Sequence, residues 1–186
     1  MPHVCSPNRL DSASSGLLVI DVQEKLCPSI STAEQVIGQI NRLVEVGKLL
    51  SIPMAATVQY PRGLGPLVPS LAEVFPTPEE KVSFSAAVCR QALDQWTSQG
   101  RDQIVIVGIE THICVQQTVL DLMAEGLRPF VVADAVAARA TLDHDVAINR
   151  MRDSGATVIT VESVMFEWLG TAERPVFKAV SKIIKS

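Results

Sequence analysis

The eight residues GIETHICV, at positions 108–115, place a cysteine between an aliphatic run and a stretch of helical period. We expect Cys114 at the head of a helix, where unpaired N–H groups and a partial positive charge favour a thiolate and stabilise an adjacent oxyanion. A reactive thiolate beside such an oxyanion site implies acyl transfer. The competing interpretation is a structural thiol, because free cysteine is among the most buried residue types.

Charged residues stand at the ends of other apolar runs. Asp21 follows four apolar residues, and Lys81 directly precedes the run VSF. In a parallel α/β sheet, polar residues at the carboxyl ends of strands face the crevice where ligands bind. A carboxylate, an ammonium and the Cys114 thiol on three strand ends would therefore converge. The alternatives are a helix cap for Asp21 and a solvated surface lysine for Lys81. Asp134 closes a later run in the same way, and its local sequence does not distinguish it from Asp21.

The elements that must position these residues are short aliphatic runs alternating with longer segments of helical period. Strands are expected at residues 17–21, 54–59, 82–84, 104–109, 130–134 and 157–160. Most are apolar on successive residues, as in a parallel sheet that is covered on both faces. Helices are expected at residues 32–50, 85–99, 112–125, 142–154 and 175–184. The pattern predicts an α/β fold, a three-layer α/β/α sandwich that is Rossmann-like, with a six-stranded parallel sheet in the order 3-2-1-4-5-6.

Composition limits the class of protein. The chain has 186 residues, of which 47% are hydrophobic and 19% charged, and its formal net charge is -4. We expect a single domain over residues 1–186, with an extended N-terminal segment at 1–14. No apolar run approaches the roughly 18 residues of a membrane-spanning helix. The 16 Lys and Arg residues are scattered, which argues against a nucleic-acid surface. A membrane and a nucleic acid are thus not expected as partners.

The cysteines and histidines do not form a recognisable metal or disulfide pattern. The chain has four cysteines and three histidines, with no CxxC pair and no cysteine/histidine cluster. Cys5, Cys27 and Cys89 fit structural roles. Because there is no secretory signal peptide, we expect reduced thiols and a cytoplasmic protein. No metal and no cofactor are expected.

Three motifs carry a family resemblance. Asp21 in LLVIDVQ, Lys81 in KVSFSA and Cys114 in GIETHICV match, in order and spacing, the Asp, Lys and Cys motifs of the isochorismatase-like cysteine hydrolase superfamily. The resemblance extends over residues 16–169. The segments QYPRGLGPLVPSL and GLRPFVVADAVAAR further resemble the isochorismatase domain-containing proteins, a subgroup with poorly defined substrates.

The resemblance implies a role for each of these residues. Asp21 would be the general base that takes the proton from Cys114 and later activates water. Lys81 would hold the carboxylate and the thiolate in register and favour their charged forms. The backbone N–H groups of Glu110 and Cys114 would form the oxyanion hole, with a non-proline cis peptide bond between Ile109 and Glu110. The family also suggests a homo-oligomer.

Other positions are candidates for substrate contacts. Gln59 and Tyr60 end the second expected strand, Phe84 ends the third, and His112 precedes the nucleophile by two residues. Their structural alternatives are a rigid irregular loop, a core aromatic residue and a solvent-facing helix residue. The nicotinamidases of the superfamily bind a metal through an Asp-x-His motif. This chain has QYPRGLG at that position, which disfavours the metal site and nicotinamidase activity.

Three functions remain open. The first is hydrolysis of a small-molecule amide, carbamoyl or ureido C–N bond through a Cys114 thioester. The second is hydrolysis of a vinyl ether, as in isochorismatase, in which Asp21 supplies a proton and the thiol is dispensable. The third is a non-catalytic scaffold. We favour the first, because a scaffold has no need to keep a desolvated Asp21 and Lys81 together.

Overall fold

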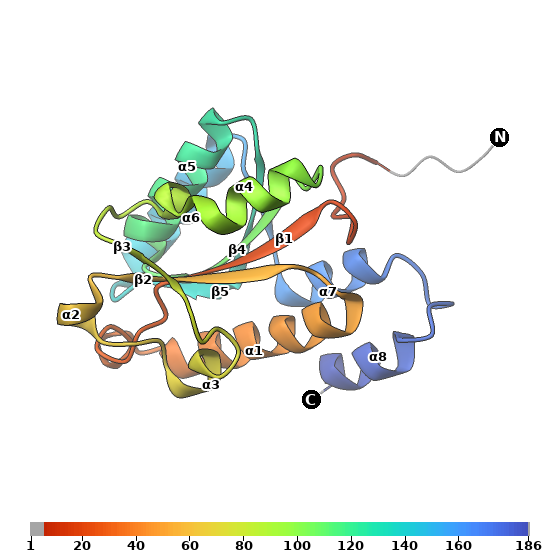
Figure 1. The fold of residues 1–186 in the computed structure, drawn as a ribbon, viewed down its shortest axis with the longest axis horizontal. Coiled ribbons are helices and arrows are strands. Elements are labelled where there is room, and N and C mark those ends of the chain that lie inside the picture. Colours follow the sequence, from red (N-terminus) through yellow and green to blue (C-terminus); the bar gives the residue numbers. More distant parts are fainter. Residues whose placement is uncertain (1–5, 186) are drawn as a thin grey trace.

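The computed structural model describes residues 6–185, in which six parallel strands form one sheet (Figure 1). The strands are β1 (Ser15–Ile20), β2 (Met54–Gln59), β3 (Glu79–Lys81), β4 (Gln103–Ile109), β5 (Arg128–Ala137) and β6 (Thr157–Ile159). Their spatial order is β3-β2-β1-β4-β5-β6. The predicted fold class and strand order are confirmed.

Helices cover both faces of the sheet. The helices α1 (Ala33–Leu50), α7 (Val161–Leu169) and α8 (Phe177–Lys185) lie on one face, and α4 (Arg90–Ser98), α5 (Gln116–Ala124) and α6 (Thr141–Asp153) lie on the other (Figure 1). Alternate residues of β1 serve the two layers, because Leu17 and Val19 pack with the first set of helices while Leu18 and Ile20 pack with the second. This double burial explains why the strands are apolar on successive residues. No helix within residues 6–185 is both long and apolar enough to cross a membrane.

The sheet changes winding direction between β1 and β4. The chain leaves β1 toward α1 on one face and leaves β4 toward α5 on the other, so the carboxyl ends of β1 and β4 border a crevice. The two backbones approach closely there, because Ile20 pairs with Gly108. A Cβ atom on Gly108 would lie 2.1 Å from the Ile20 carbonyl oxygen, and Gly108 has a φ of 120°. Only glycine fits this position.

The third strand is not where the sequence pattern places it. It spans Glu79–Lys81 instead of residues 82–84, because Gln59 of β2 pairs with Lys81 and the ladder ends there. Val82 is 81% exposed and Phe84 is 53% exposed. These residues form a bend, so the strand predicted from their apolar and β-branched side chains is not present there.

The expected helices also differ in detail. The helix expected at residues 85–99 is divided into a 3-10 turn, Ala86–Val88, and α4, with Cys89 between them. The helix expected at residues 112–125 begins with a π turn, Thr111–Val115, before α5. The helix α7 was not expected, although its buried residues recur at helical spacing. Two short helices, α2 (Pro61–Leu64) and α3 (Pro69–Ala72), interrupt the loop after β2.

The segment before β1 is irregular instead of extended. Residues 6–14 form turns and bends, and Leu10 is buried in the core. The Leu10 N–H donates to Glu167 Oε2 at 2.7 Å, which ties the segment to α7. Cys5 lies outside the described residues.

We expect Gly108→Ala to lower the free energy of unfolding by about 3 kcal/mol or more, because the new Cβ would collide with backbone and the φ would be strained. Gly38→Ala is the matched control, since Gly38 lies in α1 with open space at its Cβ position. That change should stabilise the helix by about 0.5–1 kcal/mol. Urea unfolding of both variants measures the difference, and equal effects would contradict the close approach of β1 and β4.

Candidate active site

The three residues expected to converge do so at the carboxyl edge of the sheet. Asp21 follows β1, Lys81 is the last residue of β3, and Cys114 lies in the π turn after β4. The Lys81 Nζ atom lies 2.5 Å from Asp21 Oδ2, and both side chains are fully buried. The charges of both side chains also act on the Cys114 thiol, in opposite directions. The structure thus brings a thiol, a carboxylate and an ammonium group into one site.

Asp21 is oriented by its backbone and by a hydroxyl group. Its φ of 54° lies in the left-handed region, which aspartate tolerates better than most residues, and turns the chain away from β1. The Thr57 Oγ1 hydroxyl donates to Asp21 Oδ1 at 2.8 Å. Since Lys81 occupies Oδ2, each carboxylate oxygen has a donor within the protein.

Lys81 is held by acceptors on both sides. Its ammonium donates to Gln59 Oε1 at 2.8 Å, to the Phe84 carbonyl at 2.9 Å and to the Ser83 carbonyl at 3.3 Å. The bend after β3 therefore wraps around the ammonium and turns its carbonyl groups inward. A buried lysine needs such partners, because desolvation penalises its charge.

Gln59 supports the Lys81 ammonium. Its Nε2 donates to the Val82 carbonyl at 2.8 Å while its Oε1 accepts from Lys81. Both ends of its side-chain amide are therefore hydrogen-bonded within the protein, a use of Gln59 that its place at a strand end did not predict.

Sequence reasoning also missed residues that support the triad. Gln23 bridges the ends of two strands, since its Oε1 accepts from the Gln59 N–H at 2.8 Å and its Nε2 donates to the Gln59 carbonyl at 3.0 Å. Thr118 donates to the Cys114 carbonyl at 2.6 Å and accepts from the Ala86 N–H at 2.7 Å. The sequence signal that could have identified such residues is a polar residue within a mainly apolar strand, as Thr57 is within β2.

The Cys114 thiol is not preactivated in the way its position suggests. Burial raises the pKa of Cys114 to about 12, and the Asp21 charge adds to this effect, while Lys81 acts in the opposite direction. Burial also raises the pKa of Cys89, to about 11. Desolvation and the neighbouring carboxylate therefore oppose the activation that is expected for a thiol at the start of a helix.

The turn that carries Cys114 is tied to the segment after β5. The Ile109–Glu110 peptide bond is cis, at the position that the resemblance implies. The Glu110 carboxylate is buried, and its Oε2 accepts from the Arg139 backbone N–H at 2.9 Å and from Arg139 Nε at 3.1 Å. The Thr111 hydroxyl lies 3.0 Å from His144 Nδ1 of α6.

The remaining substrate candidates lie at the surface around the triad. Tyr60 and Phe84 are each 53% exposed, so Phe84 is not a core aromatic residue. His112 lies against α6, with its Nε2 atom 3.8 Å from Asp143 Oδ2. Within residues 6–185, no three His, Cys, Asp or Glu side chains are grouped as metal ligands would be.

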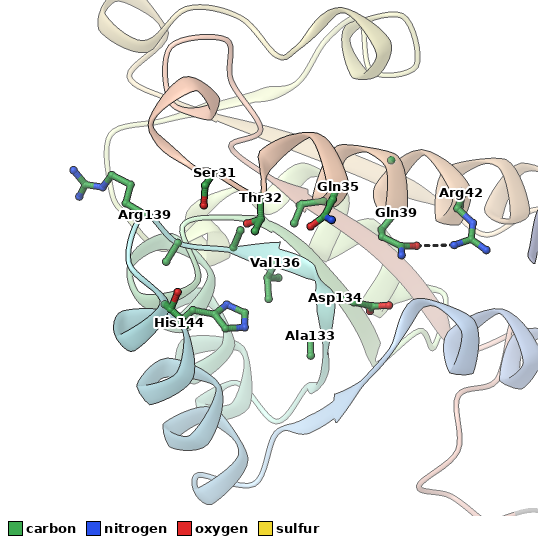
Figure 2. Close-up of a pocket in the computed structure, with 15 residues that line it drawn as sticks. Ser31, Thr32, Gln35, Gln39, Arg42, Ala133, Asp134, Val136, Arg139 and His144 are labelled. Carbon is green, nitrogen blue, oxygen red and sulfur yellow. Dashed lines mark hydrogen bonds between the residues drawn. The ribbon is translucent and has the colours of Figure 1, made fainter. Parts of the chain in front are cut away.

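A cavity of about 690 Å³ lies beside this site without including the triad. Thr32, just before α1, and Gln35 and Gln39 of α1 face the end of β5 and His144 of α6 across it (Figure 2). None of Asp21, Lys81 and Cys114 lines this cavity. It shares Arg139 and His144 with the contacts that hold the Cys114 turn.

Comparison with known proteins places this arrangement in a family. The model of the isochorismatase domain matches residues 15–163, which include all three triad residues. The chain belongs to the isochorismatase family. Within this family, it is 40% identical over 180 residues to mouse isochorismatase domain-containing protein 2A, with 97% of this chain and 87% of the relative covered.

Solved structures of similar fold include two of particular interest. The structure of MAR1 ribonuclease from Caenorhabditis elegans has a TM-score of 0.88 and 37% identity, over 96% of this isochorismatase-family chain and 93% of the other. YcaC from Escherichia coli, described as an octameric hydrolase of unknown specificity, has a TM-score of 0.87 and 24% identity, over 97% and 91% of the two chains. The latter identity supports a shared fold only.

We expect Lys81→Met to lower the free energy of unfolding by about 3–5 kcal/mol, because it leaves the buried Asp21 charge without a partner. The double variant Asp21→Asn/Lys81→Met should be more stable than Lys81→Met alone, since it also removes that charge. The surface pair of Arg90 and Asp94 is the control, and Arg90→Ala should cost less than about 1 kcal/mol. Urea unfolding tests all three, and a double variant less stable than Lys81→Met would contradict the pairing.

We expect alkylation of Cys114 by iodoacetamide to accelerate about tenfold per pH unit between pH 7 and pH 10, because a raised thiol pKa leaves the thiolate fraction growing throughout this range. Peptide mass spectrometry at each pH separates Cys114 from the other cysteines. A rate that levels off below pH 8 would show a thiolate already formed at neutral pH and would contradict the raised pKa.

Proposed function

We propose that the protein is a hydrolase that cleaves the C–N bond of a small amide, carbamate or ureide through a thioester on Cys114. The observation that carries this proposal is the buried Lys81–Asp21 pair beside the thiol, with side chains fully withdrawn from solvent. Desolvating two charges is costly, so a fully buried ion pair beside a nucleophile indicates a functional site more than a stabilising one.

The first half-reaction forms the thioester. Cys114 Sγ attacks the substrate carbonyl carbon as Asp21 takes the thiol proton, and the carbonyl oxygen becomes an oxyanion. The backbone N–H groups of Glu110 and Cys114 stabilise that oxyanion. The C–N bond then breaks, the amine leaves with the proton returned by Asp21, and the acyl group remains on sulfur.

The second half-reaction releases the acyl group. A water molecule gives a proton to Asp21 and attacks the thioester carbonyl carbon. The C–S bond then breaks, the acid leaves, and the proton from Asp21 restores the thiol. Lys81 keeps the carboxylate in place through both steps, since its ammonium is fixed by Gln59 and the Phe84 carbonyl.

The raised pKa of the thiol supports proton transfer during attack and not before it. A thiol whose pKa is about 12 is almost wholly protonated at neutral pH, so a base must act as the C–S bond forms. Asp21 is the carboxylate whose charge acts on that thiol. An amide substrate also needs a proton donor for its leaving amine, which the protonated Asp21 provides.

The name of the C. elegans structure raises RNA as another substrate. RNA cleavage depends on cationic groups that hold phosphates. Lys81 is buried and commits its ammonium to Asp21, to Gln59 and to two carbonyl groups, which leaves it poorly placed for a phosphodiester. This arrangement favours a neutral carbonyl substrate.

We also propose self-association. The family resemblance suggests it, and E. coli YcaC, which shares this fold, is itself described as octameric. Sedimentation velocity of the purified chain tests it, and a monomer at micromolar concentration would contradict it.

We expect Cys114→Ala to reduce ammonia release from an active amide, carbamate or ureide by at least about 1,000-fold, because the nucleophile that forms the covalent intermediate is lost. A coupled glutamate dehydrogenase assay over a panel of such compounds identifies the substrate and measures the loss. Cys89→Ala is the matched control, because Cys89 is also buried with a raised pKa and should leave the rate within about twofold.

Other outcomes of this screen separate the alternatives. Turnover that survives Cys114→Ala but not Asp21→Asn would replace the thioester route with proton transfer from Asp21, as in vinyl-ether hydrolysis. Cleavage of a fluorogenic RNA by the wild type, lost in Cys114→Ala, would replace the proposed substrate class. No turnover of any compound would favour the scaffold.

A further inference from the structure

Glu110 links the proposed oxyanion hole to a residue outside the triad. Its side chain extends from the turn before Cys114 and is 7% exposed, and its Oε2 accepts from both the N–H and the Nε of Arg139. The Arg139 side chain is 58% exposed and makes no part of the core. A single exposed arginine therefore holds a buried carboxylate at the residue whose backbone N–H is assigned to the oxyanion.

The sheet register explains why Arg139 reaches this turn. Ile109 at the end of β4 pairs with Ala137 at the end of β5, so the chain two residues beyond Ala137 runs beside Glu110. The same segment makes a second contact, because His144 Nδ1 lies 3.0 Å from the Thr111 hydroxyl. Glu110 and Thr111, two successive residues shortly before Cys114, are thus each contacted by a residue that follows β5 in the chain.

We propose that Arg139, acting through the Glu110 carboxylate, is a positioning residue that sets the orientation of the Glu110 backbone N–H for the oxyanion. This inference rests on the proposed thioester chemistry. Oxyanion stabilisation depends on donors fixed near 3 Å from the developing charge, so a small displacement of the turn slows acyl transfer. Arg139 does not touch the reacting atoms, and its effect passes through the side chain of Glu110.

A second ion pair between the same strands provides a matched control. Arg128 at the start of β5 makes two bonds of 2.7 Å to the carboxylate of Asp102, just before β4. The Arg128 side chain is 42% exposed. Both pairs thus join β4 to β5 through an exposed arginine, one at the amino ends and one at the carboxyl ends beside Cys114. Loss of either affects packing, but only the Arg139 pair adjoins the site.

The test measures acetylation of Cys114 by p-nitrophenyl acetate. Sγ attacks the acetyl carbon, p-nitrophenolate leaves in a burst, and water later hydrolyses the acetyl thioester to acetate. We expect Arg139→Ala to lower the burst rate constant at saturating ester about 10- to 100-fold with little change in half-saturation. Arg128→Ala should change it by less than about twofold, even where the melting temperature falls equally.

Conservative variants separate positioning from general damage. Arg139→Lys keeps a cation and should recover part of the rate. Glu110→Ala removes the acceptor for both Arg139 groups and should be at least as slow as Arg139→Ala, and the double variant should be no slower than Glu110→Ala. Alkylation of Cys114 by iodoacetamide at pH 9 forms no oxyanion and should stay within about twofold in Arg139→Ala.

The outcomes distinguish this inference from the function on which it rests. A wild-type burst that matches Cys114→Ala removes the thioester proposal and this inference with it. A wild-type burst that Arg139→Ala leaves unchanged, or slows no more than Arg128→Ala does, overturns the inference alone. An equal loss of acetylation and alkylation in Arg139→Ala also overturns it, because the effect would then lie on the thiol and not on the oxyanion.

Discussion

The ion pair between Lys81 and Asp21 is the interaction on which the site depends, because two charges without solvent require a complete set of partners. The protein supplies these partners from β2 and from the bend after β3. Thr57 fixes the free carboxylate oxygen, while Gln59 and the carbonyl groups of the bend after β3 hold the ammonium. The pair is thus also a constraint on the loops, since each partner must stay in place for the charges to remain buried.

The Cys114 thiol approaches this ion pair from the turn after β4, across the point where the sheet changes its winding direction. Burial and the Asp21 charge raise the pKa of Cys114, so the proposed thioester route requires a base that acts as the C–S bond forms. The turn that carries it is supported separately, through Glu110 and Arg139 from the β5 side. The two halves of the site therefore have independent supports, with base and ammonium held by β1, β2 and β3, and nucleophile and proposed oxyanion donors held by β4, β5 and α6.

Much of the fold follows from the sequence because burial on both faces leaves an unbroken apolar signal in each long strand. The short strand β3 gives no such signal. Its residues Glu79–Lys81 are charged, and the apolar Val82 and Phe84 beyond it are largely exposed. Pairing with β2 decides where this strand ends, and a local pattern contains no information about that partner. The helix α7 was missed although its apolar residues do recur at helical spacing.

The sequence by itself determined the order of strands and helices and the three residues at strand ends, because apolar periodicity and motif spacing are local properties of the chain. Only the tertiary structure decided the burial, the hydrogen-bond partners and the pKa values of such residues in the folded protein. The position of Cys114 after a strand predicts an acidic thiol, whereas its raised pKa comes from burial and from a carboxylate 93 positions earlier in the chain. The support that Gln59 gives to Lys81 is likewise visible only once its amide partners are known. Desolvation and hydrogen-bond partners depend on distant segments, and they are set only when the chain folds.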